Sequence, residues 1–409
     1  MLHRIWFGFF LVAFVSALFQ WLVAGDADVF KRMVGALFEM AGLSVELAIG
    51  LIGLMAFWLG VMAIGEASGL IEKLSRMLSP LFTRLMPEVP AGHPAISSMT
   101  LNLSANMLGL DNAATPMGIK AMQDLQTLNP TPDTATNAQI LFLVLNTSAV
   151  TLFPVTILLY RAQLGASDPA SVFIPILIAT SCSTIAGLLV TAWVQKIKFW
   201  DTIVLAYFLG GFCCLLALIG WFSTLGASEL QRQSSLISNL AILSLIMLFL
   251  IVAHRRCVNV YETFIEGAKQ GFESAISIIP YLLAMLVAIG VFRASGALDL
   301  VMGALHSAVS QGGWDSRWVD AVPTALMKPL SGSGARSMMI ETMNTFGVDS
   351  FQGRLAATMQ GSTETTFYVL AVYFGAVGIR HSRHALACGL AADVAGMVAA
   401  VFVAYWFYG

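Results

Sequence analysis

Charged residues are scarce in this sequence, and their scarcity argues against a water-soluble protein. Asp, Glu, Lys and Arg make up 11% of the 409 residues, and 58% are hydrophobic, whereas soluble domains carry about 25% charged residues. The mean hydropathy is +0.81. A formal net charge of −2 provides no basic excess, so we expect no nucleic-acid partner. The composition predicts an integral membrane protein whose main partner is the lipid bilayer.

Motifs for enzyme chemistry, metals and cofactors are also missing from the sequence. There is no P-loop and no nucleophile elbow, and the histidines lack Cys or carboxylate neighbours at ligand spacing. The cysteines lie in or beside apolar segments, without the spacing of a zinc site or a disulfide framework. We therefore expect no enzyme activity, no metal and no cofactor. The five cysteines are Cys182, Cys213, Cys214, Cys257 and Cys388.

Long apolar runs dominate what the sequence does contain. Stretches 28–41 and 258–272 mix polar and apolar residues with helical spacing, which predicts helices lying in the membrane interface. Two short pieces near 95–110 and 322–331 are rich in Ser, Asn, Gly and Pro. They predict re-entrant hairpins, because irregular backbone at membrane depth must be covered by protein or face a cavity. Nine further segments have the length and polarity of membrane spans: 5–24, 43–65, 137–160, 172–195, 201–224, 233–253, 274–295, 351–375 and 385–408.

The two halves of the chain repeat each other. Glu-Leu-Ala-Ile at 46–49 matches Glu-Ser-Ala-Ile at 273–276, and Ala-Ser-Gly at 67–69 recurs at 294–296, both with an offset of 227 residues. Later matches keep the same order with a smaller offset, which indicates a duplication. We predict a first repeat over 1–198, a linker membrane helix over 199–228 and a second repeat over 229–409.

The basic residues near the span ends predict the orientation. With a cytoplasmic N-terminus, 11 Lys and Arg residues fall on the cytoplasmic side and six outside, as the positive-inside rule requires. Four spans per repeat and one linker span then invert the second copy and place the C-terminus outside. The predicted fold is an all-α polytopic membrane protein with two inverted-topology repeats, each with four spans, an interfacial helix and a re-entrant hairpin. Such repeats are typical of secondary transporters, although channels can share them.

A polar run in the second hairpin is the first candidate binding site. Ser331, Gly332, Ser333 and Gly334 allow a tight turn before a helix, whose free N–H groups and dipole attract an anionic group. Arg336 would add a two-pronged donor for carboxylate or phosphate. In the alternative interpretation, Ser and Gly pack helices together and Arg336 extends toward the interface.

A second polar run interrupts an apolar segment of helix length. Glu364 is a candidate for coupling a proton or sodium ion to transport, because carboxylates inside membrane helices usually belong to ion or substrate paths. Alternatively, Glu364 forms a buried ion pair with Arg336. Asp393 in the last span is a weaker candidate for ion coupling. The neighbours of Glu364 complete the cluster, with Gln360, Ser362 and Thr363 as solute ligands and Thr365 as a further ion ligand.

The first hairpin carries neutral polar groups. Amides and hydroxyls suit sugar hydroxyls, a nucleobase edge or a dehydrated cation, so we predict a solute-binding wall here. Turn formation and helix capping are the alternative role for the asparagines. Val150 stands where the second half has Glu364, which makes the predicted site asymmetric. The residues of this wall are Asn102, Ser104, Asn106, Asp111 and Asn112.

These motifs resemble a known group of families. The run 102–116 is similar to spore maturation protein A, and the runs 331–336 and 360–365 are similar to spore maturation protein B, as if the two were fused. Both belong to the nucleoside-recognition or gate domain group, which is similar to parts of concentrative nucleoside transporters and of the ferrous-iron permease. The resemblance implies a multi-pass protein of the bacterial cytoplasmic (inner) membrane.

Two functional hypotheses follow. The first is an ion-coupled secondary transporter of a small polar or anionic solute, nucleoside-like by resemblance, with a midplane site between the two hairpins. The second is a non-transporting membrane module that supports or regulates envelope or spore maturation. We also expect a homo-oligomer, because related transporters assemble in that way.

Overall fold

A computed structural model describes residues 2–90, 92–107, 111–197, 201–313 and 315–409. These residues are helical apart from their connections, with one isolated β-bridge between Thr134 and His381. They divide into two compact units, and each unit draws segments from both halves of the chain. Unit 1 comprises Met1–Leu59, Thr156–Pro169 and Ala268–Gln360, and unit 2 comprises Gly60–Val155, Ala170–Gly267 and Gly361–Gly409.

Unit 1 holds the N-terminal helix and a sharply bent helix pair. The amide of Gln20 on α1 donates to the carbonyl of Ser295 at 2.6 Å, and α11 and α12 bend by 67° beside this point. Met285, Ile289 and Met338 belong to a small buried core. The helices are α1 (Leu2–Ala24), α2 (Asp28–Ala67, to Leu59 in this unit), α7 (Val155–Gln163), α11 (Val260–Ala294, from Ala268), α12 (Ala297–Gln311), η2 (Arg317–Ala321), α13 (Val322–Met327), α14 (Gly332–Phe346) and α15 (Phe351–Gly361).

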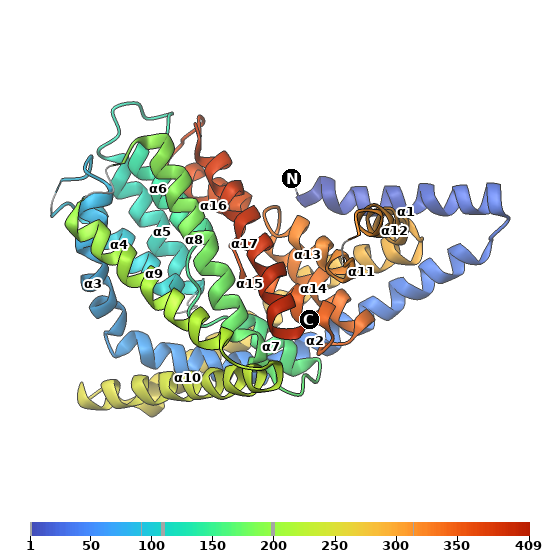
Figure 1. Ribbon diagram of the computed structural model, residues 1–409, viewed down its shortest axis with the longest axis horizontal. Coiled ribbons are helices and arrows are strands. Elements are labelled where there is room, and N and C mark those ends of the chain that lie inside the picture. The colour runs from blue at the N-terminus through green and yellow to red at the C-terminus, as the bar shows by residue number, and fades with distance from the viewer. Residues whose placement is uncertain (1, 91, 108–110, 198–200, 314) are drawn as a thin grey trace. The chain divides into compact units, whose positions relative to one another are not determined.

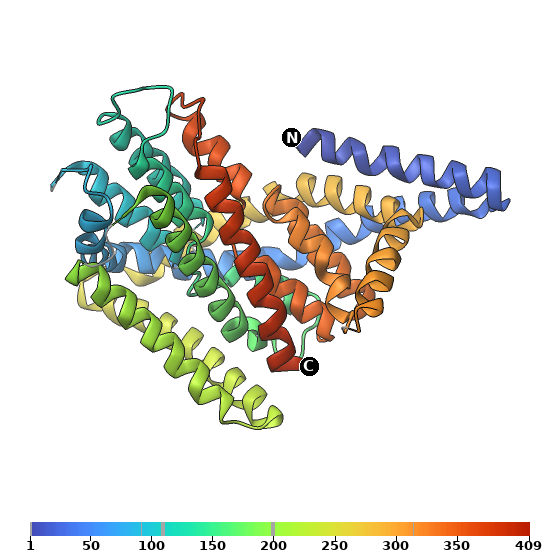
Figure 2. The ribbon, with the colours of Figure 1, turned by 45° about the horizontal axis from the view of Figure 1, so that its top comes forward.

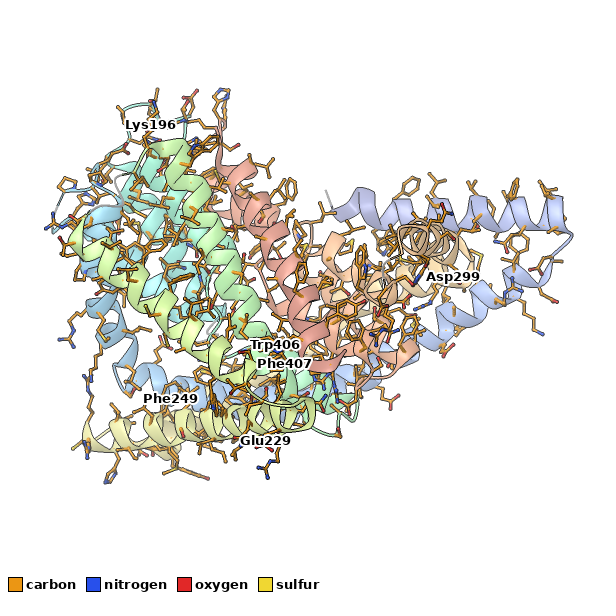
Figure 3. The ribbon with its side chains drawn as sticks, in the orientation of Figure 1. Lys196, Glu229, Phe249, Asp299, Trp406 and Phe407 are labelled. Atoms are coloured by element: carbon orange, nitrogen blue, oxygen red, sulfur yellow. The ribbon has the colours of Figure 1, made fainter. Side chains whose placement is uncertain are left out.

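Unit 2 has the larger core, and two long helices run side by side through it, α8 and α17 (Figures 1 and 2). The ring of Phe142 stacks on that of Tyr373 at 5.9 Å. Phe407, near the end of α17 (Figure 3), packs on Phe222 at 5.6 Å. The helices that lie mainly in this unit are α3 (Leu70–Leu85), α4 (Pro94–Met107), α5 (Asp111–Gln126), α6 (Asn137–Thr147), η1 (Pro169–Val172), α8 (Phe173–Gln195), α9 (Thr202–Ser223), α10 (Ala227–Arg255), α16 (Thr366–Gly375) and α17 (Ala385–Tyr408).

The helices recur in the same order in the two halves of the chain. A long helix, α2 or α11, leads to a glycine in the left-handed conformation, Gly69 with φ 68° or Gly296 with φ 71°, a conformation that glycine adopts without steric cost. A short helix, α3 or α12, follows, then the pairs α4–α5 or α13–α14, and the last long helix is α8 or α17. The described helices thus agree with a duplicated chain, while the inversion of one copy stays a prediction.

The predicted set of nine continuous spans is wrong. Among the described residues, six helices are long and apolar enough to cross a membrane, or seven if the bent pair α11–α12 counts as one span. The segments 137–160 and 351–375 each contain an interruption, at 148–154 and at 362–365. Pro154 lacks an N–H and disfavours helix in the residue before it. In the second interruption Ser and Thr hydroxyls compete for backbone hydrogen bonds.

The predicted interfacial helices are also wrong as separate elements. Residues 28–41 form the start of α2, which runs on for 40 residues, and 258–272 largely form the start of α11, which has 35. Each stretch does change in polarity along its length. Each helix nevertheless continues through the glycine near the end of its stretch, Gly42 in α2 and Gly271 in α11, because a single glycine weakens a helix without ending it.

Candidate functional site

In unit 2, backbone groups released by the two helix interruptions are taken up by partners close by. The N–H of Glu364 donates to the carbonyl of Thr147, the last residue of α6, at 2.7 Å, and the N–H of Leu152 donates to Met107 at 3.0 Å. The hydroxyl of Thr180 on α8 donates to the carbonyl of Ala149 at 2.8 Å. Such satisfaction is what allows non-helical backbone inside a membrane protein. The second interruption is therefore hydrogen-bonded to the end of α6, directly before the first interruption begins.

A chain of amide and phenol groups lies beside the interruptions. The buried amide of Asn102 donates to the carbonyl of Ala114 at 2.7 Å and to the hydroxyl of Tyr373 at 3.2 Å. That hydroxyl donates to the amide oxygen of Asn146 at 3.3 Å, which also accepts from Asn106 at 2.8 Å. The Oδ1 atom of Asn102 is buried and has no hydrogen-bond donor among the described residues. A donor group on a solute would satisfy this oxygen.

Helix α17 brings a carboxylate to the second interruption. Asp393 is 1% exposed and its Oδ2 accepts from the hydroxyl of Thr366 at 2.7 Å. Gly389 and Gly396 lie one turn to either side of Asp393 and allow the close approach. A Cβ atom at Gly396 would come within 2.8 Å of Thr363 Cγ2 and 3.0 Å of the carbonyl of Ser362. The carboxylate of Asp393 thus lies beside Thr366, where the second interruption ends and α16 begins.

In unit 1, the predicted anion site is the N-terminus of α14. This helix begins at Gly332, within the run in which the sequence predicted a turn. The hydroxyl of Ser331 caps it by accepting from the N–H of Gly334 at 3.0 Å. The guanidinium of Arg336 lies 5.5 Å from the ring centroid of Tyr160, and its Nε is buried without an acceptor in the described part of the chain. The positive N-terminal end of α14 and the guanidinium of Arg336 thus belong to the same short segment.

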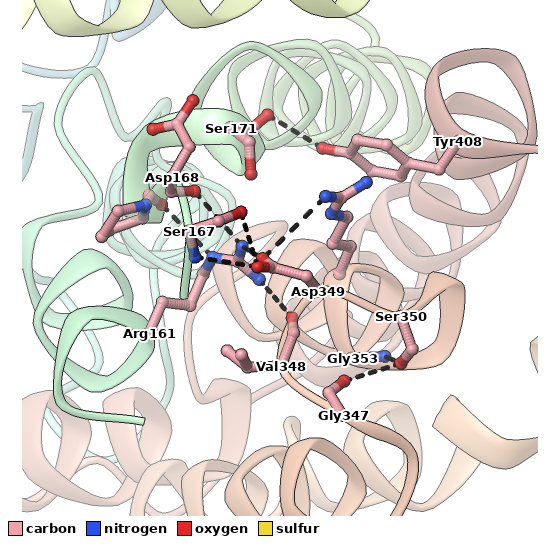
Figure 4. A network of polar contacts seen from close by, with 12 residues as sticks. Arg161, Ser167, Asp168, Ser171, Gly347, Val348, Asp349, Ser350, Gly353 and Tyr408 are labelled. Carbon is pink, nitrogen blue, oxygen red and sulfur yellow. Dashed lines mark hydrogen bonds and ion pairs between the residues drawn. The ribbon is translucent and has the colours of Figure 1, made fainter. Parts of the chain in front are cut away.

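Unit 1 also contains a buried charge cluster that motif searching missed, shown in Figure 4. Arg161 is fully buried and donates to the carboxylate of Asp349 at 2.8 Å and to the carbonyl of Val348 at 2.8 Å. The same carboxylate accepts from the N–H and hydroxyl of Ser167 at 2.8 and 2.7 Å. Burial raises the pKa of Asp349, but the Ser167 hydrogen bonds and the charges of Arg161 and Arg354 outweigh it and leave that pKa below its usual value.

The predicted site residues are distributed over both units. Asn102 and Asn106 meet in the amide chain, whereas Ser104 donates to the carbonyl of Thr100 in its own helix at 2.6 Å. The side chains of Asp111 and Asn112 lie outside the described part of the structure. Ser331, Gly332, Ser333, Gly334, Arg336 and Gln360 belong to unit 1, and Ser362, Thr363, Glu364, Thr365 and Asp393 belong to unit 2.

The proximity of Arg336 to Glu364 stays a prediction, because the two residues belong to different units. Within unit 2, the hydroxyls of Thr363 and Thr365 are buried, and Thr363 Oγ1 has no described partner. In unit 1 the same holds for Oε1 of Gln360. Buried polar atoms without partners are unusual in native proteins and mark places where a ligand could bind.

Tyr373 is the functional candidate that sequence reasoning missed. Its hydroxyl joins Asn102 to Asn146, two residues of the first half, yet an aromatic residue in an apolar helix is usually only a packing group. A usable pattern does exist. Tyr373 lies seven residues after Thr366 and therefore on the same face of α16, which is the face that carries polar contacts.

Comparison with known proteins identifies both copies. Residues 48–163 and 275–380 match the Gate family, described as nucleoside recognition. Spore maturation protein B of Bacillus subtilis (strain 168) is 52% identical over 152 residues, which cover 37% of this chain and 84% of that protein. Spore maturation protein A of the same strain is 39% identical over 155 residues, 38% of this chain and 79% of that protein. These matches confirm the resemblance that the motifs indicated.

Proposed function

Because the chain belongs to the nucleoside-recognition Gate family and carries its domain twice, we propose that it is a transporter of a small polar or anionic solute. The observation that carries this proposal is the pair of helix interruptions, one in each copy, joined by the hydrogen bond from Glu364 to Thr147. Interrupted helices at corresponding positions of two repeats mark the substrate and ion sites of secondary transporters. The family's description makes a nucleoside-like solute the first to test.

The amide chain of unit 2 supplies the contacts for such a solute. Asn102, Asn146 and Asn106 offer both donors and acceptors, which suits the edge of a nucleobase or the hydroxyls of a sugar. Tyr373 adds an aromatic face backed by the stacked ring of Phe142. In unit 1, the N-terminus of α14 and Arg336 would separately hold an anionic group.

The coupling ion would bind beside Asp393. A carboxylate buried in a membrane helix is costly unless it takes up a proton or a cation. The hydroxyl of Thr366 donates to Asp393 at 2.7 Å, and Glu364 lies in the interruption that ends just before Thr366. Either a proton or a sodium ion meets these requirements, and ion-dependent transport is the finer part of the proposal.

The test is uptake into proteoliposomes loaded with defined ions. Purine and pyrimidine nucleosides and an anionic nucleotide are offered with a sodium or a proton gradient. Asn146→Ala removes hydrogen bonds to Asn106 and Tyr373 and should lower uptake about 30-fold, at about 1 kcal/mol per hydrogen bond. Asp393→Asn should leave the protein folded and remove the dependence on the ion gradient.

The matched control is Asn239→Ala, which changes an exposed amide on α10 and should leave uptake unchanged. Gradient-driven uptake of no offered solute, or equal uptake by wild type and Asn146→Ala, would count against transport through this site.

A second candidate function is supported by the names of the two Bacillus relatives, which refer to spore maturation. In that case the protein would be a membrane module that supports an envelope-building complex and moves no solute. The polar clusters would then only stabilise the fold. Asn146→Ala would lower the melting temperature without changing any ligand response, and deletion of the gene would be complemented by a variant that is inactive in uptake.

A further inference from the structure

Unit 2 contains a cavity away from the helix interruptions. It has a volume of about 430 Å³ and lies among the loop after α3, the connection from α5 to α6, and Arg383, which precedes α17 by two residues. This size is within the range of small-molecule sites in proteins. Its inner wall is apolar and buried, with Val89, Leu125 and Ala138 among the lining residues.

Hydrogen bonds hold together the segments that surround this cavity. The carbonyl of Asp133 accepts from the N–H groups of Arg380 and His381 at 2.8 and 2.9 Å, and the N–H of Ala135 donates to His381 at 3.0 Å. Asn129 and a capping box at the start of α6 fix the rest of the connection. The cavity is therefore largely formed before any ligand binds, which lowers the entropic cost of binding.

Two opposite charges line the cavity, next to neutral polar residues, which are Asn129, Thr131, Thr134, Thr136 and Asn137. Glu88 is exposed, and one of its carboxylate oxygens accepts from the amide of Asn137 at 3.1 Å. Arg383 is exposed on another wall, where its Nη1 donates to the carbonyl of Ala135 at 3.0 Å. Each group makes a hydrogen bond that orients it and retains further oxygen or N–H positions. A ligand of one charge sign would meet repulsion as well as attraction.

We propose that this cavity binds a small apolar zwitterion of amino-acid or dipeptide size, with its ammonium group at Glu88 and its carboxylate at Arg383. The carboxylate matches the planar donor group of the arginine, and an aliphatic side chain matches the wall of Val89, Leu125 and Ala138. The site is independent of the proposed transport path. Because the lining includes the start of α6 and Arg383 just before α17, a bound ligand would restrain the two helices that carry Asn146 and Asp393.

The experiment is a thermal-shift titration of the purified full-length protein in detergent. L-Leucine and leucyl-leucine are the probes, and N-acetyl-leucine and leucinamide are matched analogues that each lack one charge. A probe at 100 times its Kd should raise the melting temperature by about 3 °C. The analogues should raise it much less, because each leaves one charged wall without its partner.

Variants localise the effect. Glu88→Gln and Arg383→Gln should each remove the shift, whereas Glu262→Gln and Arg255→Gln change exposed charges elsewhere in unit 2 and should retain it. Asn146→Ala should also retain the shift, which separates this site from the proposed transport site. No shift with either zwitterion, equal shifts with the uncharged-end analogues, or a full shift in Glu88→Gln would overturn the proposal. The analogue comparison uses wild-type protein and stands even if Arg383→Gln fails to fold.

Discussion

Replacing Arg161 with alanine should destabilise unit 1 strongly. The side chain of Arg161 is 0% exposed, and its guanidinium donates to the carboxylate of Asp349 and to the carbonyls of Val348, Asp168 and Pro169 at 2.8 to 3.3 Å. The alanine variant leaves these acceptors without their shared donor. Removing one partner of a buried ion pair typically costs about 3–5 kcal/mol.

The exposure of Asp349 places the expected cost at the lower end of this range. Its side chain is 29% exposed, so water can solvate the carboxylate once Arg161 is gone, and we expect a loss of about 3 kcal/mol. Arg161→Lys should cost about 1–2 kcal/mol. Lysine keeps the charge but cannot reach Val348 and Asp349 at once with a planar pair of donors.

The assay is unfolding of the purified protein in mixed micelles titrated with SDS, followed by circular dichroism. A double-mutant cycle with Asp349→Asn isolates the coupling between the two side chains. Arg232→Ala is the matched control, because Arg232 also contacts a carboxylate, Glu229 at 2.9 Å, but is 74% exposed and should cost at most about 1 kcal/mol. A cost for Arg161→Ala no larger than that of the control would refute the argument.

The same cluster predicts a dependence on pH. The pKa of Asp349 is lower in the folded protein than its ordinary value, so its contribution to stability is fully present above the unfolded pKa of about 3.9. That contribution is lost as the pH falls through the lower, folded pKa. The stability difference between wild type and Asp349→Asn should therefore shrink below about pH 4, and a difference that grew there would have the wrong sign.

Three further outcomes are expected. Burial and the charge of Arg383 lower the pKa of His384, so the melting temperature should fall as the pH drops below about 6.5, and His384→Gln should flatten that profile. Gly396→Ala should cost about 1–3 kcal/mol in SDS unfolding because its Cβ meets the Ser362 carbonyl, whereas Gly210→Ala, with open space around it, should stabilise α9 slightly. Tyr160→Phe should raise the melting temperature, because the hydroxyl it removes is buried without a described partner, and Tyr160→Leu should lower it by removing the ring beside Arg336.

The sequence predicted the membrane class, the duplication and most long helices, because each of these depends on averages over many residues. The interruptions could not be found in that way. Residues 148–154 include Leu152 and Phe153, which keep the window apolar although Pro154 is visible. The interruption at 362–365 is only four residues long. Its polar residues were recognised as a site, but their effect on the helix depends on partners far away in sequence, such as Thr147.

The charge cluster of Arg161 was missed for a related reason. Asp349 lies 188 residues after Arg161 and 182 residues after Ser167. Asp349 and Ser167 are each an ordinary loop residue when considered alone. In the sequence alone, Arg161 is only one of the basic residues near span ends from which the orientation was predicted. A fully buried arginine is recognisable only once its acceptors are known, because burial of a guanidinium requires several of them at once.

The two interruptions differ in their side chains, which supports different roles for the two copies. Their backbones are alike, since each leaves a helix and is held by neighbouring hydroxyl or carbonyl groups. Their side chains differ, because the first contains Val150 at the position of Glu364 and the second approaches Asp393 through Thr366. Neutral amides from the first copy and ionisable groups from the second therefore converge within unit 2. Under the proposed function, the amides would bind the solute and the ionisable groups the coupling ion, and the hydrogen bond from Glu364 to Thr147 would let one affect the other.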